Sequence, residues 1–460
     1  MDRVEDLGLH VTTGLNVAVI GGGWAGCAAA AELARLGHRV TLLEAGAELG
    51  GRARRLVLEL AGERHVLDNG QHLLIGAYTA TAALMSQVGV ALDAAFARRP
   101  FEIAYPDGMR MRAARLPAPW HLALALLTAR GLGGHDRLAL AGFLPRARGL
   151  DWKVLPDRSA SEWLQRLGQT PRLVERIWRP LTLAALNTPL AEASAQVLAT
   201  VLRDSLGASA AAAEMWLPRA NLSAAMPDAV ERYLVARGGT VRRNSRVDLA
   251  RCSERGWSLA IRSGGDHASL DVDGVVYAAP AAQLQRVLGL HADAMRPQLR
   301  MIDRFRYQPI TTVYLKYERP AVARLPGLFN ALVEDAPRRH HGQWVFNRGA
   351  LDADNAGVLA LVISTGGTHE EPTLDALCEA AARQMSDLYG LPAPRAARAI
   401  IERRATLACV PDLERPPSPT GLARLALAGD WTASEYPCTL ETAVRSGLAA
   451  ARSIGALPTN

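Results

Sequence analysis

The chain has 460 residues, a length at which the hydrophobic core is normally divided between two domains. Because 49% of the residues are apolar and the mean hydropathy is +0.03, extended disorder is excluded. The net charge of +7 comes almost entirely from arginine, since Lys153 and Lys316 are the only lysines. This charge suits an anionic cofactor, a diphosphate-bearing partner or an acidic lipid surface, but also a simple solvated surface.

The chain is predicted to begin with a β-α-β unit. Residues 15–20 form a short strand, residues 28–36 an alanine-rich helix that ends at Gly37, and residues 38–44 a second strand. Such a unit has parallel strands joined by a crossover helix. Residues 68–76 then form a loop rich in glycine and polar side chains.

Residues 77–219 are predicted to be mainly helical, with segments rich in leucine and alanine that are broken by prolines. Strands are expected at residues 242–252, 257–261 and 272–279, where glycine pairs mark the turns. The remaining predicted elements are strands at 309–317, 343–346 and 358–364, a helix over 374–389, a strand over 425–428 and a helix over 439–454.

Three glycines lie between the first strand and the first helix in the spacing G-x-G-x-x-G. Gly21 permits a tight turn, Gly23 lets the backbone approach a pyrophosphate, and Gly26 lets the helix pack closely on the strand. The free N–H groups of the helix start would bind the diphosphate, and Glu44 at the end of the second strand would accept hydrogen bonds from ribose hydroxyls. The arrangement predicts a dinucleotide site rather than a glycine-rich turn.

The Leu-Gly-Gly-Arg sequence at residues 49–52 indicates which dinucleotide this is. A second glycine pair and an arginine would bring backbone and guanidinium to the far side of a longer dinucleotide, which an NAD domain does not need. The alternative interpretation is an ordinary turn that carries a surface arginine. The sequence therefore predicts FAD as the cofactor.

Both ends of the chain carry motifs of a known superfamily. Residues 17–55 resemble the opening of the flavin-containing amine oxidases and phytoene desaturases, and residues 427–447 resemble their second flavin motif. The resemblance implies that Asp430 contacts the ribityl–diphosphate region and that the following helix begins beside the isoalloxazine ring. A helix dipole there would stabilise the negative charge of a reduced flavin.

These observations predict an α/β protein, in which a Rossmann-type FAD-binding domain is interleaved with an α+β substrate-binding domain. The FAD-binding domain is expected to comprise residues 15–76, 220–290 and 400–456, and the substrate-binding domain residues 77–219 and 291–399. The residues expected to bind the cofactor are Gly21, Gly23, Ala25, Gly26, Glu44, Gly51, Arg52, Gly70, Gln71, Val247, Gly429, Asp430, Thr439 and Leu440.

Residues 68–78, with the sequence Asp-Asn-Gly-Gln-His-Leu-Leu-Ile-Gly-Ala-Tyr, resemble a narrower group. This group is the squalene-associated FAD-dependent desaturases, the hydroxysqualene dehydroxylases of hopanoid and squalene biosynthesis. The resemblance implies an apolar C30 isoprenoid substrate, hydroxysqualene, that is converted to squalene. An acid would assist loss of the allylic hydroxyl, an apolar pocket would shield the cation, and reduced flavin N5 would deliver a hydride.

Asp68 and His72 are the predicted catalytic residues, one donating a proton while the other orients it. Each has a structural alternative, because Asp68 could cap the loop and His72 could hydrogen-bond the flavin or a backbone carbonyl. Tyr436 and Glu441 are further candidates, for which a structural role beside the flavin is favoured.

Three other functions stay open: a desaturase that oxidises a carotenoid or phytoene-type precursor, an amine oxidase, and a non-catalytic flavin or isoprenoid carrier in a biosynthetic complex. The sequence does not identify the electron donor. A separate nicotinamide site would need its own G-x-G-x-x-G motif, and the chain has no second motif of this kind. The synthases that form hydroxysqualene are candidate partners. Nucleic-acid binding is not expected without a basic stripe interleaved with aromatic residues. A metal is not expected either, since His369-Glu370-Glu371 is followed by Thr373 where a zinc motif needs a second histidine.

The sequence also bears on location. The first fifteen residues are charged and have no apolar core, and the five cysteines show no disulfide or metal spacing, so we expect a cytoplasmic protein. The uncharged stretch 116–129 is shorter than the roughly 20 residues that span a bilayer. Residues 116–127 and the arginines after them, Arg130, Arg137, Arg146 and Arg148, would suit a surface that docks on anionic lipid at the inner face of the membrane. The preferred interpretation is a buried helix of the substrate domain with solvated arginines.

Overall fold

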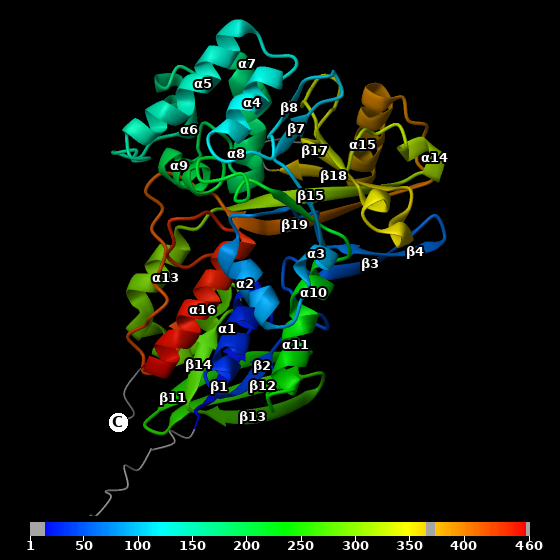
Figure 1. The fold of residues 1–460 in the computed structure, drawn as a ribbon. Helices are drawn as coiled ribbons and strands as arrows, with labels where there is room; N and C mark the ends of the chain where they lie inside the picture. The colour runs from blue at the N-terminus through cyan, green and yellow to red at the C-terminus, as the bar shows by residue number, and fades with distance from the viewer. Residues whose placement is uncertain (1–13, 365–372, 457–460) are drawn as a thin grey trace, which may run out of the picture.

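The computed structural model describes residues 14–364 and 373–456, which form two lobes, one above the other in Figure 1. The lower lobe is built on a parallel sheet with the strand order β10-β2-β1-β14-β20. This sheet confirms the predicted Rossmann-type fold. Its strands are β1 (Asn16–Ile20), β2 (Arg39–Leu43), β10 (Thr240–Arg242), β14 (Gly274–Tyr277) and β20 (Leu425–Leu427).

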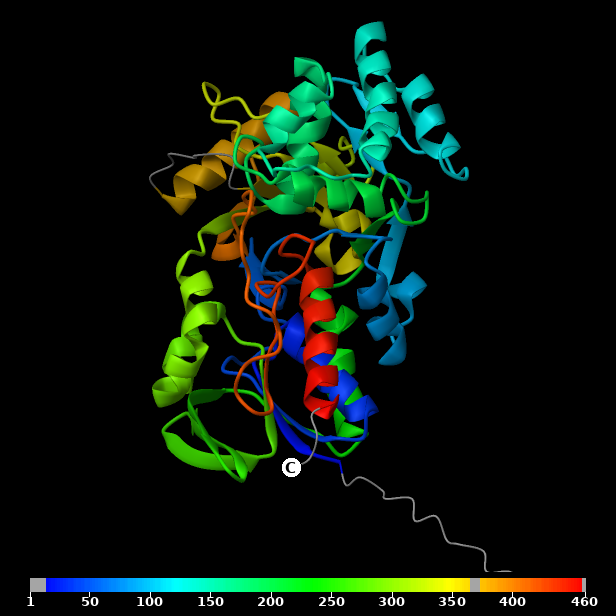
Figure 2. The same ribbon diagram turned by 90° about the vertical axis from the view of Figure 1, so that its left-hand side faces the viewer.

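The parallel sheet is covered on both faces, as its continuous apolar strands require. Val17 and Val19 of β1 face a helical layer, whereas Ala18 and Ile20, pointing the other way, meet an antiparallel sheet and short helices. Figure 2 shows the helices and the antiparallel strands on different sides of the lower lobe. The helical layer comprises α1 (Trp24–Arg35), α2 (Thr79–Gln87), α11 (Pro227–Val235) and α16 (Leu440–Ala456). The opposite layer comprises β11 (Ser245–Ser253), β12 (Gly256–Ser263), β13 (Asp266–Val272), α12 (Leu284–Leu288) and α13 (Arg296–Asp303).

The upper lobe is built on an antiparallel sheet with the order β16-β17-β18-β15-β19. One face of this sheet packs on α15 (Leu374–Tyr389), and the other packs on a group of helices. The strands are β15 (Tyr307–Lys316), β16 (Phe329–Ala331), β17 (Trp344–Asn347), β18 (Val358–Ser364) and β19 (Ala396–Leu407). The helices are α4 (Trp120–Thr128), α5 (Gly134–Gly149), α6 (Ala160–Arg166), α7 (Pro171–Leu173), α8 (Arg179–Leu186) and α9 (Ala195–Asp204).

Shorter elements join the lobes or lie at their edges. They are β3 (Arg55–Leu60), β4 (Glu63–Asp68), β5 (Leu74–Ile75), α3 (Leu92–Ala95), β6 (Phe96–Arg99), β7 (Glu102–Ala104), β8 (Arg110–Arg112), β9 (Met215–Pro218), α10 (Leu222–Ala225) and α14 (Arg319–Val322). None of the helices in the described ranges is long and apolar enough to cross a membrane.

The predicted domain boundaries need two corrections. Residues 291–303 belong to the lower lobe, because Met295 and Ile302 are buried in the core beneath the parallel sheet. The predicted boundary at residue 400 falls inside β19, which pairs with β15 of the upper sheet as far as Leu407. Pro411, Pro416, Pro417 and Pro419 follow the end of β19 and mark the second boundary in the sequence.

Candidate functional site

A cavity of about 1480 Å³ lies between the two lobes. Glycines of the β1–α1 turn, the loops at residues 50–55 and 69–72 and the segment 429–441 line one part of it. Typical ligand pockets enclose roughly 300–1,000 Å³, so this cavity has room for a dinucleotide and a long second ligand.

The glycine turn forms a cradle for a diphosphate. At Gly26 an added Cβ would lie 1.8 Å from the Gly21 oxygen, and at Gly21, whose φ is +105°, it would lie 2.8 Å from the Ala278 backbone. Gly23 differs, because the nearest atom to an added Cβ is Gly51 Cα at 3.9 Å. A methyl group at Gly23 would therefore fit the protein but would occupy cavity space, as expected where a backbone approaches a pyrophosphate.

Glu44 lies at the adenosine end predicted for this cradle. One of its carboxylate oxygens accepts a hydrogen bond from the Gly22 N–H at 2.7 Å, and the other accepts from the Gly46 N–H at 2.7 Å. These bonds hold the side chain in the cavity wall, and each carboxylate oxygen has a further lone pair for a ribose hydroxyl.

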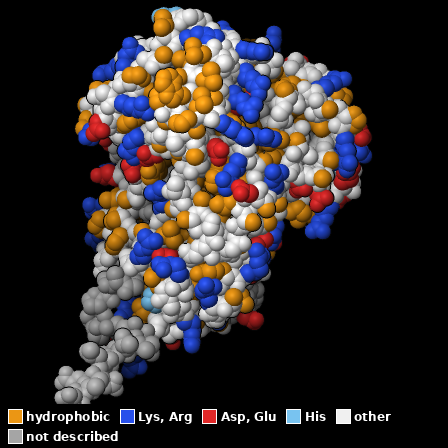
Figure 3. Space-filling model, viewed as in Figure 1, with side chains coloured by type: hydrophobic (Ala, Val, Ile, Leu, Met, Phe, Trp, Pro, Cys, Tyr) orange, Lys and Arg blue, Asp and Glu red, His pale blue; other side chains and the backbone are white. Residues whose placement is uncertain are grey.

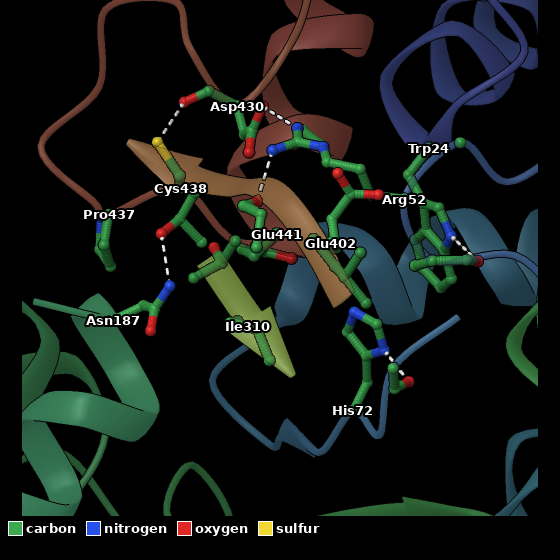
Figure 4. Close-up of a pocket in the computed structure, with 18 of the residues that line it drawn as sticks. Trp24, Arg52, His72, Asn187, Ile310, Glu402, Asp430, Pro437, Cys438 and Glu441 are labelled. Atoms are coloured by element: carbon green, nitrogen blue, oxygen red, sulfur yellow. Dashed lines mark hydrogen bonds and ion pairs between the residues drawn. The ribbon is translucent and has the colours of Figure 1, made fainter. Parts of the chain in front are cut away.

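Arg52 and Asp430 join the two flavin motifs, although 378 residues separate them in the sequence. An Arg52 guanidinium nitrogen lies 2.5 Å from Asp430 Oδ1, and another donates to the Ala405 carbonyl at 2.6 Å (Figure 4). Asp430 is buried, so the pair fixes the C-terminal motif against the residue 49–52 turn. Both side chains line the cavity and fit the ribityl–diphosphate region of a flavin.

The start of α16 opens into the same cavity. Thr439 caps the helix, since its Oγ1 accepts from the Thr442 N–H at 3.3 Å, and Leu440 follows it in the cavity wall. Glu441 accepts hydrogen bonds from the Ala80 and Thr81 N–H groups at 3.0 and 2.9 Å, which supports its structural interpretation. This helix terminus suits the flavin ring that the family motif implies.

Tyr436 lies on the rim of the cavity, where its hydroxyl donates to Asp204 Oδ2 at 2.6 Å. Burial and the neighbouring Asp204 raise the pKa of Tyr436 to about 12. The bond connects the C-terminal motif of the lower lobe with the end of α9 in the upper lobe.

The two predicted catalytic residues occupy different places. Asp68 is 3% exposed and does not line the cavity; its Oδ1 accepts from the Leu222 N–H at 2.8 Å, at the start of α10. Its backbone carbonyl accepts from the Tyr314 hydroxyl at 2.8 Å. This placement favours the loop-capping alternative for Asp68 over a proton donor in contact with substrate.

His72 does line the cavity, and its Nδ1 lies 2.8 Å from the Gly70 carbonyl (Figure 4). Because a carbonyl can only accept, Nδ1 carries a hydrogen and Nε2 is left as the ring nitrogen for a ligand. Burial lowers the pKa of His72. The loop at residues 68–72 therefore places one of the two predicted side chains in the cavity and uses the other as an anchor.

Twelve of the fourteen predicted cofactor residues line the cavity, and the two that do not are Gly26 and Val247. Gly26 instead permits the close contact between α1 and Gly21. The prediction that Val247 binds the cofactor is corrected by the structure, because its side chain is buried in the core between β11 and the parallel sheet. The twelve are Gly21, Gly23, Ala25, Glu44, Gly51, Arg52, Gly70, Gln71, Gly429, Asp430, Thr439 and Leu440.

Several cavity residues were missed from the sequence. Glu402, Arg404 and Thr406 alternate along β19 and all line the cavity. Glu402 accepts from Asn69 Nδ2 at 3.2 Å, which ties β19 to the predicted loop. The sequence of residues 402–406, Glu-Arg-Arg-Ala-Thr, shows no alternation that would have indicated these side chains as cavity residues.

The part of the cavity in the upper lobe is apolar. Helices α8 and α9 form one wall, and the antiparallel sheet forms the other. The lining side chains include Phe101, Leu181, Leu183, Leu198, Val201, Leu202, Met215, Ile310, Trp344, Phe346 and Val362. Such a surface suits a long hydrocarbon ligand, since every atom of it that leaves water contributes favourably.

Replacing Asp68 by Asn is expected to raise the free energy of unfolding by a few kcal/mol at pH 8. Burial raises the pKa of Asp68 to about 7 from 3.8, so the folded protein holds a proton that the unfolded chain releases. Titration of Asp68 leaves the free energy of unfolding unchanged below about pH 4 and lowers it progressively as the pH rises to about 7. Asn keeps the acceptor for Leu222 and does not titrate. Urea unfolding of the wild type and of D68N at pH 5 and pH 8 measures the effect. If D68N binds flavin but loses turnover, Asp68 is again a candidate for the catalytic acid.

The described residues contain no group of His, Cys, Asp and Glu that could hold a metal ion. The partial zinc motif at residues 369–371 lies outside the described residues.

Comparison with known proteins agrees with the fold and with the cradle. An oxidoreductase from Methanosarcina mazei superimposes with a TM-score of 0.73 at 16% identity, covering 95% of this chain and 100% of that one. Cyclohexylamine oxidase from Brevibacterium oxydans gives a TM-score of 0.62 at 19% identity over 96% and 98% of the two chains. These likenesses show the fold, and the family match over residues 24–455 makes the chain an FAD-dependent oxidoreductase.

The sequence matches the family described as flavin containing amine oxidoreductase over residues 24–455, and the chain belongs to this family. It is 30% identical to hydroxysqualene dehydroxylase of Rhodopseudomonas palustris, over 95% of this chain and 97% of that protein. It is 28% identical to hydroxysqualene dehydroxylase of Sinorhizobium fredii, over 95% of this chain and 97% of that protein. Zeta-carotene desaturase of Synechocystis is 24% identical, over 96% of this chain and 97% of that protein. The resemblance found in the sequence is thereby confirmed.

Proposed function

We propose that this chain reductively removes the hydroxyl group of hydroxysqualene to form squalene. The observation that carries the proposal is the apolar half of the cavity, which continues from the flavin cradle between α8, α9 and the antiparallel sheet. Full-length similarity to hydroxysqualene dehydroxylases supports the same substrate class. The volume of about 1480 Å³ gives room for an isoprenoid chain beside a dinucleotide.

In this reaction a C–O bond breaks, the hydroxyl leaves as water with one added proton, and the allylic carbon gains a hydride. Bound FAD, once reduced, would supply the hydride. We assign the proton to Nε2 of His72, because His72 lines the cavity while its Nδ1 is held by Gly70. A general acid has to lie within hydrogen-bond reach of the group that leaves.

The apolar walls would perform a second task. A water molecule beside an allylic cation would re-form the alcohol, so productive turnover requires that water be excluded until the hydride arrives. Leu183, Leu202, Ile310 and Phe346 present hydrocarbon where such a water would otherwise bind. The product squalene is less polar than the substrate and is compatible with the same walls.

A carotenoid desaturase is the second candidate. The specific observation in its favour is the full-length similarity to zeta-carotene desaturase, together with a cavity that would equally accept a polyene. In that reaction the hydride moves from substrate to oxidised flavin, so no proton has to be donated to a leaving group. His72 would then have no role as an acid.

The proposed partners follow from the substrate. A C30 isoprenoid is nearly insoluble in water, so we propose transfer from an anionic membrane or from the synthases that make it.

The two functions are distinguished by supplying each substrate to the purified protein. Anaerobically reduced protein is mixed with hydroxysqualene in detergent, and oxidised protein with phytoene, and the products are identified by mass spectrometry. The proposal predicts squalene from the first mixture and unchanged phytoene in the second. Dehydrogenated phytoene without squalene would establish the desaturase instead.

A further inference from the structure

Large hydrophobic side chains gather on the outside of α4, α5 and the turns beside them, and we call this surface the α4–α5 face. Figure 3 shows hydrophobic side chains on the upper part of the molecule with Lys and Arg around them. Among the described residues thirteen large hydrophobic side chains are exposed, and seven of them lie between residues 116 and 155. They are Leu116, Trp120, Leu124, Leu127, Leu138, Leu150 and Leu155. Single exposed hydrophobic residues are ordinary, but such a concentration marks an interaction surface.

Helix α4 is apolar on both sides. His121 and Ala125, four residues apart, are buried against the upper lobe. Trp120, Leu124 and Leu127 follow the spacing i, i+4, i+7 on the outer side, where Trp120 is 65% and Leu127 74% exposed. A helix that is hydrophobic all round is normally covered on all sides. The outer stripe of α4 is therefore expected to meet an apolar environment in the working protein.

The charges around this face are almost all positive. Residues 115–155 include six basic and two acidic residues, a net charge of +4 out of +7 for the whole chain. Asp136 is buried and hydrogen-bonded to Thr170, and Asp151 pairs with Lys153 at 2.7 Å, so neither carboxylate pairs with an arginine of this face. In the described part of the chain no carboxylate pairs with the exposed Arg115, Arg130, Arg146 or Arg148. An apolar patch with an arginine rim is complementary to acyl chains beneath anionic headgroups.

The same helix lies next to the cavity. Leu206 follows α9 and lines the cavity, and its backbone lies beside the imidazole of His121 on the buried side of α4. The adjacent Gly207 carbonyl accepts from Arg148 at 2.8 Å. About one helix diameter, roughly 10 Å, thus separates the outer stripe of α4 from the cavity wall.

We propose that the α4–α5 face docks on an anionic phospholipid bilayer and that the substrate enters the cavity from the lipid through the segment after α9. The route, but not the docking, rests on the proposed isoprenoid substrate. Arginines at the rim contact headgroup phosphates, while Trp120, Leu124 and Leu127 enter the boundary between headgroups and acyl chains.

Flotation of the full-length protein with vesicles tests the docking. One set of vesicles contains phosphatidylcholine alone, and the other contains phosphatidylcholine mixed with phosphatidylglycerol. The wild type is expected to float only with the anionic vesicles, and less so at high salt. A Trp120→Ser/Leu124→Ser/Leu127→Ser variant is expected to lose at least about tenfold in partition coefficient. An Arg115→Gln/Arg130→Gln/Arg146→Gln variant should lose about fivefold for each arginine.

Matched variants elsewhere on the surface provide the controls. Leu36→Ser/Val235→Ser/Leu290→Ser removes exposed hydrophobic side chains, and Arg251→Gln/Arg255→Gln/Arg319→Gln removes exposed arginines, so both are expected to float as the wild type does. Equal flotation of the α4–α5 variants and the wild type would overturn the docking. So would a wild type that binds neither kind of vesicle, a result that would point to a protein partner on this face.

Turnover in detergent separates this inference from the proposed function. A serine variant that makes squalene in detergent at the wild-type rate, but slowly from vesicles, supports the route through the lipid. A wild type that floats but never makes squalene would refute the proposed function and leave the docking intact. Conversely, squalene formed in detergent by a protein that does not float would refute the docking alone.

Discussion

Gly23→Ala is expected to abolish FAD binding while leaving the fold intact. An added Cβ at this position meets no protein atom closer than 3.9 Å, and Gly23 has no positive φ that would strain an alanine. The methyl group instead occupies the cradle where the backbone should approach the diphosphate. Purified G23A should show a wild-type circular dichroism spectrum but none of the flavin absorbance near 450 nm, an approximate wavelength set by the cofactor itself.

Gly26→Ala is the matched comparison, because it adds the same methyl group three residues later. There the Cβ would lie 1.8 Å from the Gly21 oxygen, so α1 cannot keep its contact with the β1 turn. We expect G26A to lose stability or fail to fold, whereas G23A loses only the cofactor. Normal flavin content in G23A would contradict the position assigned to the diphosphate.

His72→Asn is expected to reduce turnover by about 10² or more, with normal flavin content, because a general acid typically contributes 10²–10⁴-fold. The protonated imidazole is the active form, and burial lowers its pKa below the ordinary value of 6.5. Turnover of the wild type should therefore fall as the pH rises through that lowered pKa. Rates measured in single turnover across pH 5 to 8 test the assignment.

Tyr436→Phe is the control for the histidine. The pKa of Tyr436 is raised to about 12, so a tyrosine acid would give no decline in rate between pH 5 and 8. Removing its hydroxyl breaks the bond to Asp204 but leaves the ring in place. We expect a modest loss of turnover in Y436F. A large loss of turnover in Y436F, together with near-normal turnover in H72N, would assign the role of proton donor to Tyr436 instead of His72.

The cofactor site was predictable because its requirements are local. Gly21 and Gly23 follow a strand and precede a helix, and Glu44 ends the next strand, so geometry alone brings them to one edge of the sheet. The pairing of Arg52 with Asp430 was not predicted, since 378 residues separate the two and each was assigned to the cofactor separately. Val247 was predicted to bind the cofactor, but its side chain is buried in the core on the other side of the parallel sheet from α1.

The substrate half of the site was less accessible to prediction. Strands β6 to β9 are only three or four residues long, too short for an alternation to indicate a strand, and the sequence of residues 77–219 therefore predicts mainly helices. Asp68 and His72 lie four residues apart on one loop, and only the structure reveals that one caps α10 and the other lines the cavity. The outward side of α4 was likewise ambiguous, because its composition fits both a buried helix and a docking face.

The most direct test of the central claim is a single turnover of the anaerobically reduced protein with hydroxysqualene in D₂O. Reduced flavin carries an exchangeable N5 hydrogen, so hydride transfer to the allylic carbon should give squalene with one deuterium as the flavin reoxidises. Squalene with one deuterium, formed at the rate of flavin reoxidation, is the predicted result. No squalene, together with rapid reduction of the oxidised flavin by a carotenoid precursor, would contradict reductive dehydroxylation and establish the opposite direction of hydride transfer.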